Sequence, residues 1–341
     1  MTFFNSFQNK SIRIACALCA LLCLSAVARA QNDDEEIVPI NSNLVILNVG
    51  VADQKGRAVT NLSQSDFNVY EDGVKQSVVS FEPSTAPFSL VLLLDMSGST
   101  INFRPTLKQS ALRFIDALSP EDRVEVVAFN DKVQTLQHFT GDRQKIGFAI
   151  EEAKGKGSTN LYKALRHSLA ELSKEGKRRK AIVVLTDGLD TDERKLDGSA
   201  TAEAKTGDEA VATVKPDQSA ALRSVLDLAD RLGVTIYPLA LPSADPTKML
   251  PLTPQQSAIY SAARARMQTL ADRTGGRLHE IRRLEDIGRL YAEVAAEMRT
   301  LYSLASQSSN ARPRDGKWRA ITVEVARPDT IARTRPGYYA R

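Results

Sequence analysis

The sequence predicts an α/β protein with a doubly wound, mainly parallel sheet and a small β-sandwich-like domain formed by its flanks. Two almost uninterrupted apolar runs, residues 88–94 and 181–185, predict strands that are buried on both faces, as in a parallel sheet. Helical apolar stripes follow these runs, and an alternation of strand and helix is typical of doubly wound folds. Two β-rich flanks, each too short to bury a core alone, predict the second domain.

The composition is that of an ordinary globular protein. The 341 residues are 43% hydrophobic and 25% charged, which suffices for a sizeable core. The formal charge of +4 falls to +1 without residues 1–30, because 42 basic and 41 acidic residues then remain. A near-neutral chain has no bulk charge with which to attract a nucleic acid, so we expect no nucleic-acid binding.

The first 30 residues have the pattern of a secretory signal peptide. Lys10 and Arg13 precede an apolar stretch at residues 14–27, and Ala28-Arg29-Ala30 supplies small residues at a cleavage site. We expect cleavage after Ala30 and a secreted or periplasmic mature protein. The alternative, an uncleaved anchor, is disfavoured because the apolar run is shorter than the ~20 residues that a spanning helix needs.

The remainder of the chain adds two expectations about its chemistry. All three cysteines lie in the leader, so the mature chain is expected to form no disulfide and no thiolate metal site. No later apolar run is long enough to span a bilayer, so we expect no membrane span in the mature chain.

The N-terminal segment, residues 31–84, is predicted to be β-rich. Residues 44–51 are rich in Val, Ile and Leu, which favours a strand. Glu71-Asp72-Gly73 lies between two further strand patterns, and its glycine suits the positive φ of a hairpin turn.

Residues 87–301 are predicted to form the α/β domain. After the strand at 88–94 we expect a helix over 103–118, strands at 124–129 and at the sheet edge 133–139, and a helix from Leu161. The strand at 181–185 precedes residues ~190–216, which show no apolar period and predict a partly disordered surface insertion. Further elements are expected at 218–232, 234–237, 256–274 and 284–301.

The C-terminal segment, residues 302–341, returns to strand patterns. Ile321, Val323 and Val325 alternate with polar residues, which predicts a half-buried strand. Because neither flank can bury a core alone, we expect this segment to pair with the N-terminal one.

Oxygen-bearing side chains follow the predicted strands at three places. Asp95, Ser97 and Ser99 come directly after the first buried strand, Thr159 lies in the loop before the Leu161 helix, and Asp187 follows the second buried strand. The carboxyl ends of parallel strands form the ligand-binding edge of open α/β sheets. Two carboxylates and three hydroxyls at one edge are hard donors, which predicts a Mg²⁺-like or Ca²⁺-like ion.

These three stretches resemble the metal-ion-dependent adhesion site (MIDAS) of von Willebrand factor type A domains, which have a Rossmann-like fold. Asp95-x-Ser97-x-Ser99 matches the D-x-S-x-S loop of that family, Thr159 its threonine and Asp187 its second aspartate. The resemblance extends over residues ~88–301. The flanks, including the run Arg335-Pro-Gly-Tyr-Tyr339, resemble exported bacterial proteins described as von Willebrand-related, a group noted among Acidobacteria.

The resemblance implies how the site is used. Ser97 and Ser99 would bind Mg²⁺ (or Mn²⁺ or Ca²⁺) directly, Thr159 directly or through water, and Asp95 and Asp187 largely through water. An open coordination position would then accept an Asp or Glu carboxylate of a protein ligand. Ligand binding could be coupled to a shift of the last helix, residues 284–301. The expected function is non-enzymatic adhesion or protein–protein interaction.

Two other functions stay open on the sequence. The chain could be an assembly component of a cell-envelope complex, with an ion that only stabilises the loops. Less favoured is a metal-dependent hydrolase, since the sequence places no general base or nucleophile beside the ion.

Other polar groups are given structural interpretations. Asp190, Asp192 and Glu193 are expected to form a solvated loop, with a second cation site as the less favoured alternative. His138, His167 and His279 fit no metal-binding spacing, so each is expected to be a surface or packing residue.

Overall fold

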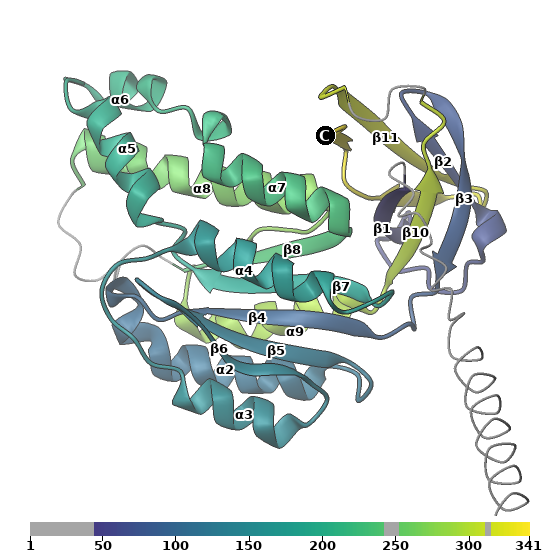
Figure 1. Ribbon diagram of the computed structural model, residues 1–341, viewed down its shortest axis with the longest axis horizontal. Coiled ribbons are helices and arrows are strands. Elements are labelled where there is room, and N and C mark those ends of the chain that lie inside the picture. Colours follow the sequence, from purple (N-terminus) through teal and green to yellow (C-terminus); the bar gives the residue numbers. More distant parts are fainter. Residues whose placement is uncertain (1–43, 242–251, 311–314) are drawn as a thin grey trace, which may run out of the picture. The chain divides into compact units, whose positions relative to one another are not determined.

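The computed structural model describes residues 44–241, 252–310 and 315–341 (Figure 1). The predicted signal peptide therefore lies outside the described residues. Among the residues that the structure does describe, no helix has both the length and the apolar character needed to cross a bilayer.

A six-stranded sheet forms the α/β part and confirms the predicted fold class. The order is β6-β5-β4-β7-β8-β9, and all neighbours are parallel except the edge strand β6, which is antiparallel to β5. The strands are β4 (Phe88–Asp95), β5 (Arg123–Phe129), β6 (Val133–Thr140), β7 (Arg179–Thr186), β8 (Val234–Ala240) and β9 (His279–Glu280).

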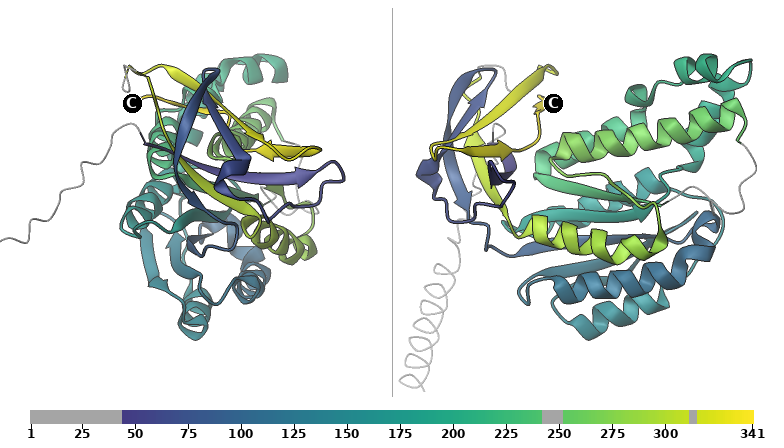
Figure 2. Two further views of the ribbon diagram at one scale, coloured as in Figure 1. Left: turned by 90° about the vertical axis from the view of Figure 1, so that its right-hand side faces the viewer. Right: turned by 180° about the vertical axis from the view of Figure 1, so that it is seen from behind.

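Helices cover both faces of this sheet (Figures 1 and 2). One apolar core packs one face of the sheet against α2 (Arg104–Ala117), α3 (Arg143–Glu152) and α9 (Ile287–Met298). A second core packs the other face against α4 (Leu161–Ser173), α7 (Ala220–Leu232) and α8 (Pro254–Thr274).

The central strand β4 shows why the sequence adopts this arrangement. All eight of its residues are buried. Leu90, Leu92 and Leu94 join the core beneath α2 and α9, whereas Val91 and Leu93 join the core beneath α4 and α7. A strand that buries both faces is apolar along most of its length, so its sequence shows a nearly continuous apolar run and not an alternation.

The two flanks together form a seven-stranded antiparallel sheet in the order β12-β1-β10-β3-β2-β11-β13. Strands from the two flanks are interleaved, since β10 pairs with both β1 and β3, and β11 pairs with β2. Fully buried Leu47, Val69 and Tyr302 lie in its core. The strands are β1 (Leu44–Asp53), β2 (Phe67–Glu71), β3 (Val74–Glu82), β10 (Leu301–Gln307), β11 (Trp318–Val325), β12 (Thr330–Arg333) and β13 (Gly337–Tyr339).

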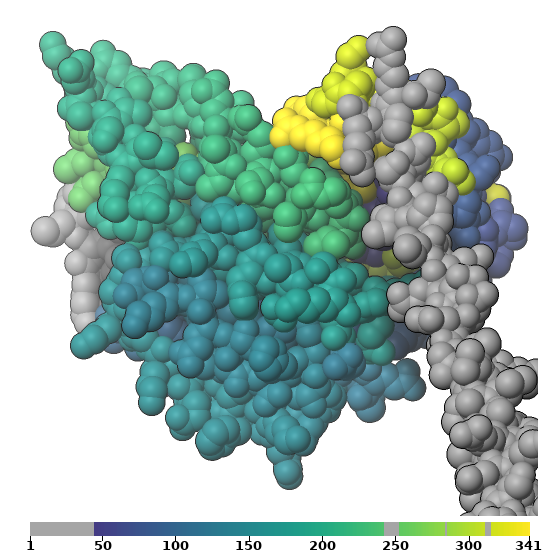
Figure 3. All heavy atoms as spheres, viewed as in Figure 1, coloured from purple at the N-terminus to yellow at the C-terminus, as the bar shows by residue number. Residues whose placement is uncertain are grey.

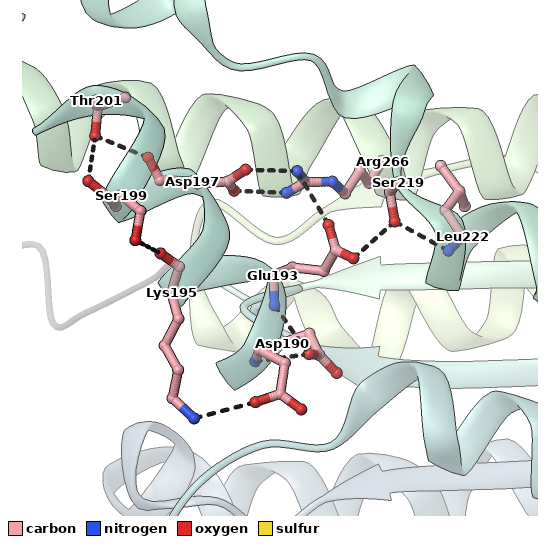
Figure 4. A network of polar contacts seen from close by, with 11 residues as sticks. Asp190, Glu193, Lys195, Asp197, Ser199, Thr201, Ser219, Leu222 and Arg266 are labelled. Atoms are coloured by element: carbon pink, nitrogen blue, oxygen red, sulfur yellow. Dashed lines mark hydrogen bonds and ion pairs between the residues drawn. The ribbon is translucent and has the colours of Figure 1, made fainter.

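The prediction of a partly disordered insertion at ~190–216 is wrong. The segment forms α5 (Thr191–Thr201) and α6 (Gly207–Thr213), which belong to the green surface seen in the space-filling view (Figure 3). Buried Arg266 of α8 makes two 2.7 Å hydrogen bonds to Asp197 of α5 and lies 3.2 Å from Glu193 Oε2 (Figure 4). A buried ion pair, and not an apolar stripe, therefore anchors α5.

Candidate metal centre

The candidate site lies at the topological switch point of the parallel sheet. From β4 the chain first builds β5 and β6 on one side and then crosses to β7 and β8 on the other. Asp95 is the last residue of β4, and Asp187 directly follows the last residue of β7, Thr186. Adjacent strand ends at a switch point leave a crevice in which open α/β sheets bind ligands.

The first loop is held in shape by hydrogen bonds to Asp95. The buried Asp95 carboxylate accepts a hydrogen bond from the Ser97 backbone N–H at 2.9 Å and another from the Thr186 hydroxyl at 2.7 Å. The hydroxyls of buried Ser97 and exposed Ser99 lie 3.1 Å apart. The two hydroxyls are therefore close enough to bind one ion together.

The second loop is joined to both of the others. The Gly98 N–H donates to the Gly157 carbonyl at 3.0 Å, which connects the first and second loops. Buried Thr159 and half-buried Thr191 exchange two 2.9 Å hydrogen bonds: the Thr159 N–H donates to the Thr191 hydroxyl, and the Thr191 N–H donates to the Thr159 carbonyl. The second loop is thereby fixed to the start of α5, directly after the third loop.

The third loop supplies a buried carboxylate, one oxygen of which accepts no hydrogen bond. Asp187 is only 4% exposed. One oxygen, Oδ1, accepts a hydrogen bond from the Leu189 N–H at 3.1 Å, whereas Oδ2 is buried without a hydrogen-bond partner. A buried carboxylate oxygen without a partner is costly, so a cation beside Oδ2 would stabilise the site.

The two carboxylates also destabilise each other in their charged forms. Burial, together with the nearby charge of Asp187, raises the pKa of Asp95 to about 7. Burial likewise raises the pKa of Asp187, although the Leu189 N–H and the Ser99 hydroxyl lower it. Two buried carboxylates and the neighbouring Ser97 and Ser99 hydroxyls, with Thr159 in the adjoining loop, fit the hard-oxygen donor set of a divalent cation, which would compensate both charges.

The structure thus brings the three predicted loops together, and it adds residues that sequence reasoning missed. Thr186 orients Asp95, and Thr191 connects Thr159 to α5. Each of them is a threonine at the end of a strand or at the start of a helix, which is a weak signal without the fold.

The interpretation of the residues after Asp187 as a solvated loop is wrong for two of the three. Buried Asp190 caps α5 by accepting hydrogen bonds from the N–H groups of Asp192 and Glu193. Buried Glu193 accepts a hydrogen bond from the Ser219 hydroxyl at 2.9 Å, in addition to its contact with Arg266. Both acidic residues already make hydrogen bonds or ion pairs within the protein, which argues against a second cation site there.

The doubly wound sheet and the oxygen-rich loops at its switch point define the class of this part of the chain. Residues 90–189 match the family model described as the von Willebrand factor type A domain. The chain therefore contains a von Willebrand factor type A domain, and this domain carries Asp95, Thr159 and Asp187.

Two relatives match about a third of the chain each. An uncharacterized protein of Synechocystis is 36% identical over 107 residues, which are 30% of this chain and 25% of that protein. The human voltage-dependent calcium channel subunit alpha-2/delta-2 is 30% identical over 117 residues, which are 31% of this chain and 10% of the subunit. The chain thus spans a quarter or less of the length of these relatives.

Among solved structures, the vWF domain of the type V pili tip protein Mfa5 from Porphyromonas gingivalis is similar with a TM-score of 0.47 and 12% sequence identity. The match covers 62% of this chain and 95% of that domain.

Proposed function

We propose that this chain is an exported, non-enzymatic binding protein whose von Willebrand factor type A domain captures a protein ligand through a divalent cation. The ion would be Mg²⁺, or Mn²⁺ or Ca²⁺, held at the edge of the sheet. Ser97, Ser99 and Thr159 would supply hydroxyl oxygens, and Asp95 and Asp187 would supply negative charge around them.

One observation carries this proposal: Asp95 and Asp187 are both buried, and Asp187 Oδ2 has no partner. A loop that needed only a stable polar structure would not bury two carboxylates that repel each other. An ion bound here supplies an electrophilic position at which an Asp or Glu side chain of a partner can bind.

The exposure of the site supports a binding role. Ser99 and Gly98 are exposed, so the first loop is open to a partner, while Asp95 behind it is fully buried. Low water access on the protein side strengthens the attraction between an ion and a partner carboxylate.

The proposal of a non-enzymatic protein rests on how the acidic groups are used. Asp95 already accepts hydrogen bonds from Ser97 and Thr186, and Asp187 accepts one from Leu189. Within the described residues, no histidine or lysine takes part in the hydrogen bonds that join the three loops. A hydrolase would need a positioned base in addition to the ion.

The proposed export rests on the leader pattern of the first 30 residues, with cleavage after Ala30. Mass spectrometry of the N-terminus of the protein recovered from its own cell would test it. A mature chain that begins at Gln31 supports export, and a chain that retains the leader contradicts cleavage.

The binding function is tested by pull-down from a cell-envelope extract in Mg²⁺ and in EDTA. We expect a partner that is retained in Mg²⁺ and lost both in EDTA and with Asp95→Ala. Asp192→Ala is the matched control, because the Asp192 side chain is 77% exposed and lies outside the three loops. Retention of the same partner in EDTA and by Asp95→Ala would contradict the proposal and favour a metal-independent assembly role.

A further inference from the structure

A second group of possible metal ligands lies at the β5–β6 edge of the sheet. One ligand atom from each of Glu125, His138 and Glu171 lies within 4.8 Å of the others. Glu125 is the third residue of β5, whereas the first site lies beyond the carboxyl end of the neighbouring strand. At ~3.3 Å per residue, the remaining four residues of β5 separate the two sites by roughly 13 Å along the strand.

An irregularity in the strand pairing brings His138 to this place. Val124 pairs with Thr140 and Val126 pairs with Gln137, so Glu125 alone faces two residues, His138 and Phe139. A β-bulge of this kind redirects side chains on the bulged strand. The bulge therefore explains why a histidine and a glutamate far apart in sequence meet.

Glu125 occupies a position at which an apolar residue is expected. Glu125 shares one face of β5 with Val127 and Phe129, which pack in the core on the α4 side of the sheet. Glu125 is nevertheless fully buried, and its Oε2 atom has no hydrogen-bond partner. A buried carboxylate oxygen without a partner is costly, so a positively charged group at this place would stabilise the fold.

The surroundings orient Glu125 toward the group. The Thr135 hydroxyl of β6 donates to Glu125 Oε1 at 3.0 Å, and Thr135 Oγ1 also lies 2.8 Å from His167 Nε2 of α4. Since the hydroxyl has a single proton, the imidazole N–H of His167 must be the donor in the second bond. His167 and Glu171 lie one turn apart on α4, which places them on one face of the helix.

The remaining two ligands can adjust around an ion. His138 is exposed, so packing does not fix its side chain, and the Glu171 side chain is 17% exposed and reaches solvent. Lys174 Nζ donates to Glu171 Oε1 at 2.7 Å, but the Lys174 side chain is 66% exposed and can withdraw into solvent. Bonds of ~2.0–2.2 Å in a tetrahedral site place ligand atoms about 3.3–3.6 Å apart, so small side-chain rotations would bring the three ligand atoms to this spacing.

We propose that Glu125, His138 and Glu171 form a zinc site, separate from the candidate site at the switch point, with a fourth position open to water. Imidazole with carboxylates favours Zn²⁺ over Mg²⁺ or Ca²⁺, which prefer oxygen ligands alone. Thr135 and His167 orient Glu125 without binding the ion. The ion would connect the edge strand β6 to β5 and α4.

The test is zinc binding by the full chain, measured in competition with a chromogenic chelator. The measurement uses an Asp95→Asn background, so that the first site does not contribute. We expect one Zn²⁺ per chain, and an affinity reduced at least tenfold by His138→Ala and by Glu171→Gln. Gln134→Ala, an exposed residue of the same strand, is the matched control and should leave the affinity unchanged.

Replacement of Zn²⁺ by Co²⁺ gives a second measurement, because visible absorption bands report tetrahedral ligands directly. We expect these bands in the Asp95→Asn protein and their loss on His138→Ala. Absence of Zn²⁺ binding in the Asp95→Asn protein, or an affinity unaffected by His138→Ala, would overturn the zinc site. Neither zinc result tests whether the wild-type protein captures a partner in Mg²⁺. The two proposals can therefore fail separately.

Discussion

The charge of Asp95 should make the metal-free protein less stable as the pH rises. Its folded pKa of about 7 lies above the value of 3.8 for an ordinary aspartate, so the folded state binds the proton more tightly than the unfolded state. The contribution of this group to stability is therefore present below pH ~4 and is lost as the pH rises toward the folded pKa. The difference between a pKa of 3.8 and one of about 7 corresponds to a loss of about 4 kcal/mol of stability at neutral pH.

Asp95→Asn removes this titration and keeps the shape of the side chain. In EDTA at pH 8 we expect the variant to be more stable than the wild type by up to about 4 kcal/mol, with a smaller difference at pH 4. Urea unfolding at both pH values measures the difference in stability. The other carboxylates contribute equally to the pH dependence of both proteins, so their contributions cancel in the comparison. Mg²⁺ at 100 times the dissociation constant should reduce this difference by about 2.7 kcal/mol, because only the wild type is stabilised by the ion. A variant that is less stable than the wild type in EDTA at pH 8 would refute the reasoning.

The remaining predictions concern the residues that support the site. Arg266→Met should destabilise the protein by about 3–5 kcal/mol in urea unfolding, because it leaves the buried carboxylate of Asp197 unpaired; a loss below 1 kcal/mol would contradict the role given to this ion pair. Gly155→Ala should weaken Mg²⁺ binding without unfolding the protein, because an added Cβ would lie 2.8 Å from the Met96 carbonyl and push the second loop from the first. Gly198→Ala, where an added Cβ meets open space within α5, is its control and should leave Mg²⁺ binding unchanged.

The α/β fold could be predicted because its buried strands are apolar runs that are recognisable in the sequence. A strand buried on both faces, such as β4, is apolar along most of its length, and this gives an almost uninterrupted apolar run in the sequence. The edge strand β6 was also predicted, although its residues are only half-buried or exposed.

The segment that became α5 and α6 could not be predicted in the same way. Its main anchor is the contact of Asp197 with Arg266, which lies 69 residues later in the chain. Such a pair leaves no apolar period in the sequence, and a window rich in charged and small residues therefore has the composition of a disordered loop.

The two proposed metal sites differ in how far the sequence could predict them, for a similar reason. Asp95, Ser97 and Ser99 are adjacent in sequence and follow a strand, so their meeting could be predicted; their binding of an ion is still a prediction. Glu125 and His138 meet only because of the bulge between β5 and β6, and the spacing of the histidines along the chain gives no indication of it.

The most direct test of the account is the effect of Mg²⁺ on the unfolding midpoint of the full chain. We predict a concentration-dependent increase that reaches about 2.7 kcal/mol at 100 times the dissociation constant and is abolished by Asp187→Ala but retained by Asp192→Ala. An unfolding midpoint that does not change with Mg²⁺, or a stabilisation that survives Asp187→Ala, would contradict the central claim that Asp95, Ser97, Ser99, Thr159 and Asp187 form a cation site.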